Sequence, residues 1–247
     1  MSNQRPQLVN DGIYHIVGRA VGDAVIFDNE DDFYRGIYSV YEFNTTDSIV
    51  IRERRRLRDQ FKKEKGIYRP LRSVNSESSV LWPDNRKKMV EILAFSFMPN
   101  HLHLIVKQLI DNGISSFMQK VCGGYAKYFN DKYNRKGHLF NLFKPIYIKT
   151  DDQLKNTFVY VHTNLISLIE PCWKEKGIEN PEKVKEFLEN NKRHSYPDYL
   201  GKKNFSSVTQ RDFLLEIMGG ADGCKAEVDN WIMYKKEMKD FGDIVLE

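Results

Sequence analysis

Two histidines one residue apart, His101 and His103, are the side chains of this sequence whose spacing points most directly to chemistry. The residues between and beyond them, Leu102, Leu104 and Val106, are apolar. Successive side chains of a β-strand point to opposite faces, so a strand here would carry both imidazoles on one face and the apolar residues on the other. Two neutral imidazoles on one face form half of a ligand set for a divalent metal ion. The sequence therefore predicts a metal-binding strand over residues 101–107.

A second candidate group lies on a helix predicted over residues 152–169. Tyr160 and Asn164 are four residues apart, so they stack on one flank of that helix, about 120° from the centre of its apolar stripe. This stripe consists of Leu154, Phe158, Val161, Leu165 and Leu168. A tyrosine and an amide in this position suit catalysis, but they are also typical of a partly buried tyrosine with a hydrogen-bonding neighbour. Taken alone, the pair leaves both interpretations open.

The composition predicts a globular protein of the cytoplasm. The chain has 247 residues, of which 41% are hydrophobic, which is enough for a large core. The polar segment 2–7 does not resemble a signal peptide, and the longest apolar runs are too short to span a bilayer. Cys122, Cys172 and Cys224 are scattered and odd in number, as expected of free thiols in a reducing compartment.

Charge is distributed unevenly along the chain, whose net charge is +4. Residues 101–150 carry eight basic and two acidic residues, whereas residues 151–247 carry fourteen basic and eighteen acidic residues. A positive region beside a candidate metal site suits a polyanionic substrate, although a solvated basic surface explains it as well. The charge-dense stretch 51–65 is interpreted as a solvent-facing helix, a mobile insertion or a nucleic-acid contact.

Periodicity predicts an α+β fold with an antiparallel sheet and helices on one face of it. His101 and His103 would then lie on the open face. The predicted strands cover residues 12–19, 90–97, 101–107 and 139–148, and the predicted long helices cover 31–43, 114–133 and 152–169. Further short helices are expected at 181–191, 208–218 and 224–240, and a loop at 72–86.

Taken together, these features resemble the HUH tyrosine transposases, in particular the IS200-like group and its REP-associated members. The resemblance is carried by five segments in the same order: residues 12–19, 98–106, 128–140, 160–164 and 195–201. It implies a ferredoxin-like or RRM-like domain over residues 1–204, with a basic insertion at about 46–88. Residues 205–247 would form a C-terminal helical extension.

The resemblance also implies an activity and a set of site residues. Tyr160 would attack single-stranded DNA, usually next to a hairpin, and form a covalent 5′-phosphotyrosine intermediate for strand transfer in DNA transposition. His101, His103 and Asn164 would hold a divalent metal ion, Mg²⁺ or Mn²⁺. Residues that would contact DNA are Lys107, Arg135 and Lys144. The family context implies a bacterial protein near the nucleoid, and homodimers are common in it.

Two other functions remain compatible with the residues. A metallohydrolase would also use a His-x-His pair, but such sites usually draw further ligands from close behind, where this chain has Ile105, Val106 and Lys107. A non-catalytic single-stranded nucleic-acid-binding protein, a domesticated transposase on the same scaffold, is the second alternative. The other histidines, His15, His138, His162 and His194, have no partner at metal-ligand spacing and are interpreted as structural or DNA-facing. Tyr125 and Tyr128 are interpreted as core residues, whereas Tyr133 is a candidate for stacking on a base.

Overall fold

A computed structural model describes residues 8–64, 84 and 86–245. Its centre is a four-stranded antiparallel sheet in the order β2-β3-β1-β4. The strands are β1 (Ile13–Arg19), β2 (Val90–Met98), β3 (His101–Gln108) and β4 (Lys144–Ile148). The central strands β1 and β3 are antiparallel neighbours, so residues far apart in the sequence share the middle of the sheet.

Two long helices connect these strands. Helix α1 (Glu30–Glu42) follows β1, and α3 (Gly113–Lys132) joins β3 to β4. The resulting succession β-α-β-β-α-β, with this strand order, is the ferredoxin-like arrangement. The α+β class and the antiparallel sheet expected from the sequence are confirmed.

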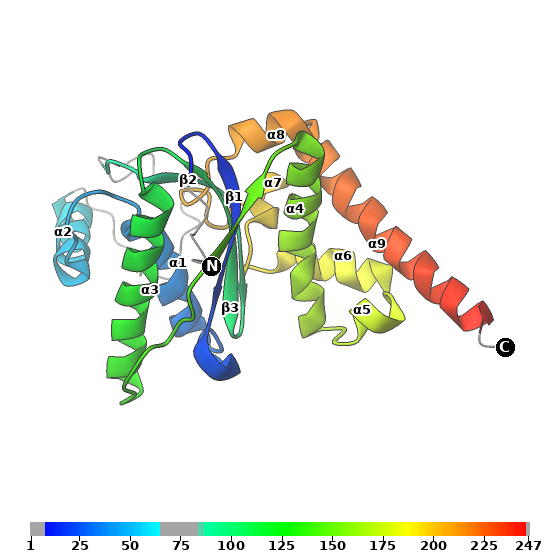
Figure 1. Ribbon diagram of the computed structural model, residues 1–247, viewed down its shortest axis with the longest axis horizontal. Helices are drawn as coiled ribbons and strands as arrows, with labels where there is room; N and C mark the ends of the chain where they lie inside the picture. The colour runs from blue at the N-terminus through cyan, green and yellow to red at the C-terminus, as the bar shows by residue number, and fades with distance from the viewer. Residues whose placement is uncertain (1–7, 65–83, 85, 246–247) are drawn as a thin grey trace, which may run out of the picture.

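The two faces of the sheet are both covered, which differs from the expectation of helices on one face. Leu102, Leu104 and Val106 pack with α1 and α3 in one core. On the opposite face, Ile105 and residues of β2 pack with α4 (Asp151–Thr163) and the C-terminal helices in a second core. Figure 1 shows α1, α2 and α3 on one side of the sheet and α4, α5, α6, α8 and α9 on the other. The histidine face is therefore covered by α4 where an open face was expected.

The second layer contains several short elements and one long helix. After α4 come a 3₁₀ turn at Asn164–Leu168, α5 (Trp173–Lys176), α6 (Pro181–Asn190), α7 (Tyr196–Tyr199), α8 (Asp212–Met218) and α9 (Gly220–Val245). Side chains of α8 and α9, including Leu214, Val228 and Ile232, are buried in the same core as α4. The C-terminal helices thus pack against the body of the protein, and a division at residue 204 stays a prediction.

Three predicted elements are shorter than expected, and the first of these is the helix predicted at 208–218, which begins only at Asp212. The fourth strand covers only residues 144–148, because residues 139–143 pass β1 irregularly: Phe140 makes an isolated bridge with Ala20, and the Asn141 side chain donates to the Ala20 carbonyl. The predicted helix 152–169 is α-helical only to Thr163. Beyond it the chain tightens into the 3₁₀ turn, so Leu168 leaves the apolar stripe and is 38% exposed.

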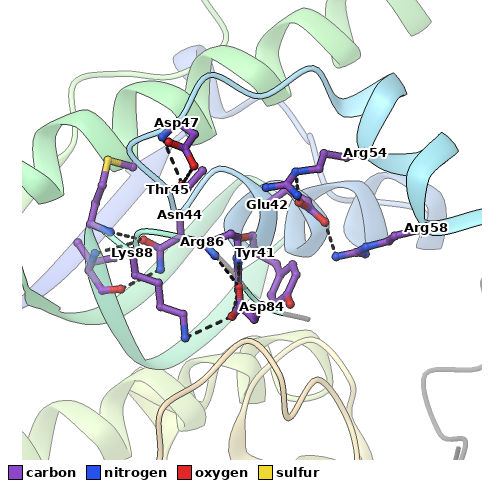
Figure 2. Close-up of polar contacts among 12 residues, drawn as sticks. Tyr41, Glu42, Asn44, Thr45, Asp47, Arg54, Arg58, Asp84, Arg86 and Lys88 are labelled. Carbon is purple, nitrogen blue, oxygen red and sulfur yellow. Dashed lines mark hydrogen bonds and ion pairs between the residues drawn. The ribbon is translucent and has the colours of Figure 1, made fainter. Parts of the chain in front are cut away.

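The basic stretch forms helix α2 (Ile51–Glu64), which lies beside α1 and α3 (Figure 1). Its Arg54 and Arg58 form ion pairs with Glu42 at the end of α1, as Figure 2 shows. Residues 65–83 and 85 of the expected insertion, which hold most of the predicted loop, lie outside the described residues. None of the helices within the described ranges is long and apolar enough to cross a membrane.

Candidate active site

The register of the central strands brings three histidines to one face of the sheet. His103 on β3 pairs with Val17 on β1, and His101 pairs with Arg19. His15 lies two residues before Val17 on β1, so it shares the face of His103. The sequence spacing of His101 and His103 is thus realised on a strand, and pairing with β1 adds a third imidazole.

A hydrogen-bonded chain runs through His103. Asn164 Nδ2 lies 2.9 Å from His103 Nε2, and an amide nitrogen can only donate, so His103 Nε2 is the acceptor and carries no proton. The proton of the neutral ring therefore sits on Nδ1, which donates to His15 Nε2 at 2.9 Å. The two rings are stacked, with centroids 5.1 Å apart and planes 11° from parallel. His15 thus fixes both the tautomer and the orientation of His103.

His101 is oriented in a similar way by its neighbour in the β2–β3 turn. Asn100 Oδ1 lies 2.6 Å from His101 Nδ1, and a carbonyl oxygen can only accept, so Nδ1 is the donor. In the neutral ring this leaves the lone pair on Nε2. The His101 and His103 ring centroids are 4.8 Å apart. In both rings the Nδ1 proton is held by a neighbour, as is typical of histidines that bind a metal ion through Nε2.

Burial keeps two of these imidazoles neutral. His103 is 3% exposed and His15 is 7% exposed. Desolvation by burial lowers the pKa of His15 to about 4. Burial also lowers the pKa of His103 to about 2, and repulsion from Lys174, and from His101 and His15 when these are protonated, contributes to the same shift. Neutral imidazoles offer a lone pair to a metal ion, whereas charged ones cannot.

Tyr160 lies over this cluster on α4. Its ring meets His103 edge-on at 5.5 Å between centroids, and it meets His15 edge-on at 5.8 Å. Unlike the histidines beneath it, Tyr160 is 43% exposed, and its hydroxyl has no hydrogen-bond partner in the part of the chain that the structure describes. A reactive group for an incoming substrate needs this combination of a fixed ring and an accessible oxygen.

The local sequence of α4 explains why Tyr160 and Asn164 lie here. The helix begins with a capping motif in which Thr150 accepts from the Gln153 backbone N–H and the Gln153 side chain accepts from that of Lys149. Buried Leu154 and Phe158 hold it against the sheet. At its end the Asn164 backbone N–H donates to the Tyr160 carbonyl, which sets the two side chains one turn apart.

The donor set suits a divalent cation once Asn164 is included. No group of three His, Cys, Asp or Glu residues forms a metal cluster within the described ranges. His101 and His103 offer imidazole nitrogens, and the Asn164 amide already contacts His103. Turning that amide over would present Oδ1, an oxygen ligand of the kind that Mg²⁺ and Mn²⁺ prefer, in place of Nδ2. The residues present therefore fit a cation held by two nitrogens and one oxygen, with its other positions left to water or phosphate.

The three basic residues expected to contact DNA are separated in the structure. Lys144 on β4 pairs with Val17, so it lies on the histidine face and is exposed there. Lys107 shares that face but lies at the other end of β3, in an ion pair with Asp11 at 3.1 Å. Arg135 donates to the His138 carbonyl at 2.8 Å and shapes the loop after α3. Of the three, Lys144 has the placement that suits a substrate at Tyr160.

Two residues of the site were not predicted from the sequence. His15 is the hydrogen-bond partner of His103, and Lys174 of α5 is near enough for its charge to lower the His103 pKa. For His15 a signal existed, because pairing the strand 12–19 next to the strand 101–107 allows the two histidines to meet. Lys174 offered no such signal, since it lies in a short helix beyond α4 whose position depends on tertiary packing.

Other histidine and tyrosine rings that the sequence offers as candidates have structural roles. His162 is fully buried, with Nδ1 close to the Phe158 carbonyl at 2.8 Å and Nε2 close to Ser195 Oγ at 2.9 Å. Tyr125, on the opposite face of the sheet, is 1% exposed in the first core. Tyr133 donates to Asp32 at 2.6 Å. Among the described tyrosines, Tyr160 is thus the one whose ring meets both His15 and His103.

Comparisons with known proteins identify one family. The family described as "Transposase IS200 like" matches residues 75–164, a segment that holds His101, His103, Tyr160 and Asn164. No curated protein matches the chain.

Two solved structures are similar to this chain over most of its length. One, "Structure of the REP associates tyrosine transposase bound to a REP hairpin", has 14% identity and a TM-score of 0.45, covering 86% of this chain and 93% of that one. Another, "Bacterial tRNA(HIS) Guanylyltransferase (Thg1)-Like Protein in complex with ATP", has 8% identity and a TM-score of 0.38, covering 76% and 72%. Both scores are too low to bear on function, so the informative comparison is the match of residues 75–164 of this chain to the IS200-like transposase family.

Proposed function

We propose that this protein cuts single-stranded DNA through Tyr160 and rejoins it by strand transfer. One observation supports this proposal above the others: an exposed tyrosine stands edge-on over a buried pair of hydrogen-bonded histidines, with an amide beside them. The rings are held in place and the tyrosine oxygen is accessible. A nucleophile next to phosphate-orienting groups is what phosphodiester cleavage needs.

The chain's own residues would divide the work as follows. The Tyr160 oxygen attacks the phosphorus after its proton is lost, and a bond forms between tyrosine oxygen and phosphorus. The bond from phosphorus to the 3′-oxygen breaks, and that oxygen leaves with its electron pair and takes up a proton. The products are a 5′-phosphotyrosine link and a free 3′-hydroxyl. Attack by a second 3′-hydroxyl reverses these steps and restores Tyr160, so no external energy source is required.

His101, His103 and Asn164 are proposed to hold Mg²⁺ or Mn²⁺. When bound, such a cation withdraws charge from the non-bridging phosphate oxygens and orients the phosphate. His15 keeps the proton of His103 on Nδ1 and so keeps Nε2 able to bind. Lys144 and Lys174 supply positive charge on the same side of the sheet, where a phosphate backbone would approach.

The direct test is a covalent-adduct assay. A labelled single strand with a hairpin is incubated with the protein and Mn²⁺, and the adduct is separated on a denaturing gel. We expect an adduct with the unaltered protein and none with Tyr160→Phe, because phenylalanine has no oxygen to form the ester. Chelation of the metal should also abolish the adduct.

The matched control is Tyr234→Phe, which removes the hydroxyl of a tyrosine on α9 that is more exposed than Tyr160, at 56% against 43%. This variant should form the adduct at the same rate as the unaltered protein. An adduct that persists in Tyr160→Phe would refute the assignment of the nucleophile. Hairpin binding without any cleavage, unaffected by chelation, would favour the non-catalytic nucleic-acid-binding protein instead.

A further inference from the structure

A shallow hollow is lined by residues of α1, α2 and α3. Figure 1 shows these helices on the side of the sheet opposite to α4, the helix that carries Tyr160. The hollow has a volume of about 250 Å³. Its lining consists of Arg35, Ile51, Arg52, Arg55 and Tyr128, and these residues define what is called here the arginine pocket. Three of the five lining side chains are cationic and none is acidic, which is unusual for the space between packed helices.

Arg35 is the most informative member of the arginine pocket. The residue is only 9% exposed, and its Nε and Nη1 atoms are buried with no hydrogen-bond partner among the described residues. Its guanidinium lies over the Tyr128 ring, 5.1 Å from the centroid, which supports the flat face of the group but leaves its N–H edge unsatisfied. Buried charged groups without partners are costly and therefore rare, so this edge points to a missing ligand.

The two buried carboxylates of α1, Asp32 and Glu42, are directed to other partners. Asp32, on the same helix as Arg35, accepts from Lys132 at 2.7 Å, Tyr128 at 2.9 Å and Tyr133 at 2.6 Å. Glu42, at the end of that helix, is paired with Arg54 and Arg58 of α2, and Figure 2 shows both arginines directed toward it. The protein thus balances the neighbouring charges and leaves Arg35 unbalanced.

Helix α2 contributes two further cationic side chains to the arginine pocket. With Arg54 and Arg58 directed to Glu42, Arg52 and Arg55 line the hollow beside Arg35. Arg55 stacks over Tyr38 at 5.5 Å, which orients its guanidinium without neutralising it. Burial, and then repulsion from Arg55, lower the pKa of Arg35. Three like charges in one hollow repel each other unless an anion joins them.

We propose that the arginine pocket binds a backbone phosphate of the DNA strand that is cut at Tyr160. The proposal rests on the proposed function for the identity of the nucleic acid. Guanidinium groups match phosphate oxygens through paired N–H donors, which favours a phosphate over a halide or a single water molecule. Basic residues continue along the exposed side of α2, including Arg56 and Lys63, and such a stripe suits a polyanion better than an isolated phosphate ion.

The position of the arginine pocket, away from Tyr160, indicates that it would bind DNA without taking part in cleavage. Ile51 and Tyr128 of the arginine pocket pack against the first core, and the helix α4 that carries Tyr160 packs in the second core, so the sheet lies between them. A strand that reaches both must pass around the edge of the molecule. The pocket would therefore hold DNA that flanks the cleaved site, and its loss should weaken binding of long strands without affecting cleavage of short ones.

The experiment measures DNA affinity by fluorescence anisotropy with a hairpin that carries long single-stranded flanks. The protein carries Tyr160→Phe, and the buffer contains a chelator, so no cleavage occurs. The test variant is Arg52→Gln with Arg55→Gln, both at exposed positions, which spares the buried Arg35 and the fold. The matched control is Lys183→Gln with Lys192→Gln, which removes two exposed charges that lie outside both the pocket and the basic stripe of α2.

We expect the pocket variant to bind the DNA about tenfold more weakly than the unaltered sequence. The slope of log K against log salt concentration should also become shallower, by about the amount that one phosphate contact contributes. The control variant should change the affinity much less. Equal losses in the two variants would overturn the proposal, since the effect would then be general electrostatics. In protein that retains Tyr160, with Mn²⁺ present, Arg52→Gln with Arg55→Gln should leave adduct formation on a short hairpin without flanks unchanged. Failure of the unaltered protein to form any adduct would refute the proposed function while leaving the affinity comparison readable.

A second arm separates DNA from free phosphate. The Arg35 Nε–H resonance is followed by NMR during titration with a thymidine dodecamer or with inorganic phosphate. A shift that saturates with the dodecamer, and that phosphate produces only at far higher concentration, supports the proposal. A site that saturates with inorganic phosphate but does not respond to the dodecamer would overturn it, as would a resonance that neither probe moves.

Discussion

Proton positions on single rings determine what the histidines can bind. His103 presents Nε2 because its Nδ1 proton is donated to His15, and His101 presents Nε2 because its Nδ1 proton is donated to Asn100. Partners of this kind orient a metal ligand and raise its basicity, although they do not touch the metal. At the residue scale, His15 is therefore a positioning residue whose contribution is measurable through metal affinity.

We expect His15→Ala to weaken Mn²⁺ binding about 10- to 100-fold, because His103 would lose the acceptor that holds its tautomer. His15→Gln should recover part of this loss, since its amide oxygen accepts the same proton. Mn²⁺ affinity is read from electron paramagnetic resonance of the free ion, and the ¹⁵N shifts of His103 report the tautomer. Unchanged affinity and tautomer in His15→Ala would show that His15 only fills space.

At the element scale, helix α3 contains two adjacent glycines, Gly123 and Gly124, which differ in how closely other residues pack against them. A Cβ atom added to Gly124 would lie 2.2 Å from Cε2 of Phe43, so this glycine lets the end of α1 pack closely against α3. A Cβ added to Gly123 would meet nothing within 4 Å. The same residue type thus permits a helix contact at one position and only loosens the helix at the next.

This difference predicts opposite effects of one substitution. Gly123→Ala should raise the free energy of unfolding by about 0.5–1 kcal/mol, because alanine reduces the entropy lost on helix formation. Gly124→Ala should lower it by about 1–3 kcal/mol, because the methyl group displaces Phe43. Urea unfolding of the two variants decides the matter, and similar changes in both would contradict the close α1–α3 contact.

At the scale of the whole molecule, the C-terminal helices complete the layer that holds Tyr160. Leu214, Met218, Cys224, Val228 and Ile232 are all buried in the core shared with α4. Contacts of α8 and α9 with α4, together with those of the sheet, mean that the helix carrying Tyr160 is supported from both sides. This packing favours one cooperative unit over a domain with a detachable extension.

Ending the chain after residue 204 should therefore destabilise the protein severely or prevent folding, because it exposes the second core. The matched control ends the chain after Trp231, which keeps α8, most of the buried α9 residues and their contacts with α4. Cooperative thermal unfolding of both truncated chains is followed by circular dichroism. A chain of 204 residues with an unchanged melting temperature would instead support the division of the domain predicted from the sequence.

The sequence by itself determined the elements and the main candidates. Alternation identified the strand of His101 and His103, helical spacing put Tyr160 and Asn164 one turn apart, and the N-cap residues located the start of α4. These features are local, because strand alternation, helix periodicity and capping depend on residues a few positions apart. For the same reason the sequence overextended the fourth strand and the last turn of α4, where the neighbouring packing decides the ends.

Only the tertiary structure decided which distant residues meet. The pairing of β1 with β3 brought His15 to His103 across 88 positions, and the covering of both faces placed α4 over the histidines where an open face had been expected. The arginine pocket likewise exists only because Glu42 draws Arg54 and Arg58 toward α1 and leaves Arg52 and Arg55 beside Arg35. Such contacts depend on strand register and on the burial of whole helix faces, which no short window of sequence specifies.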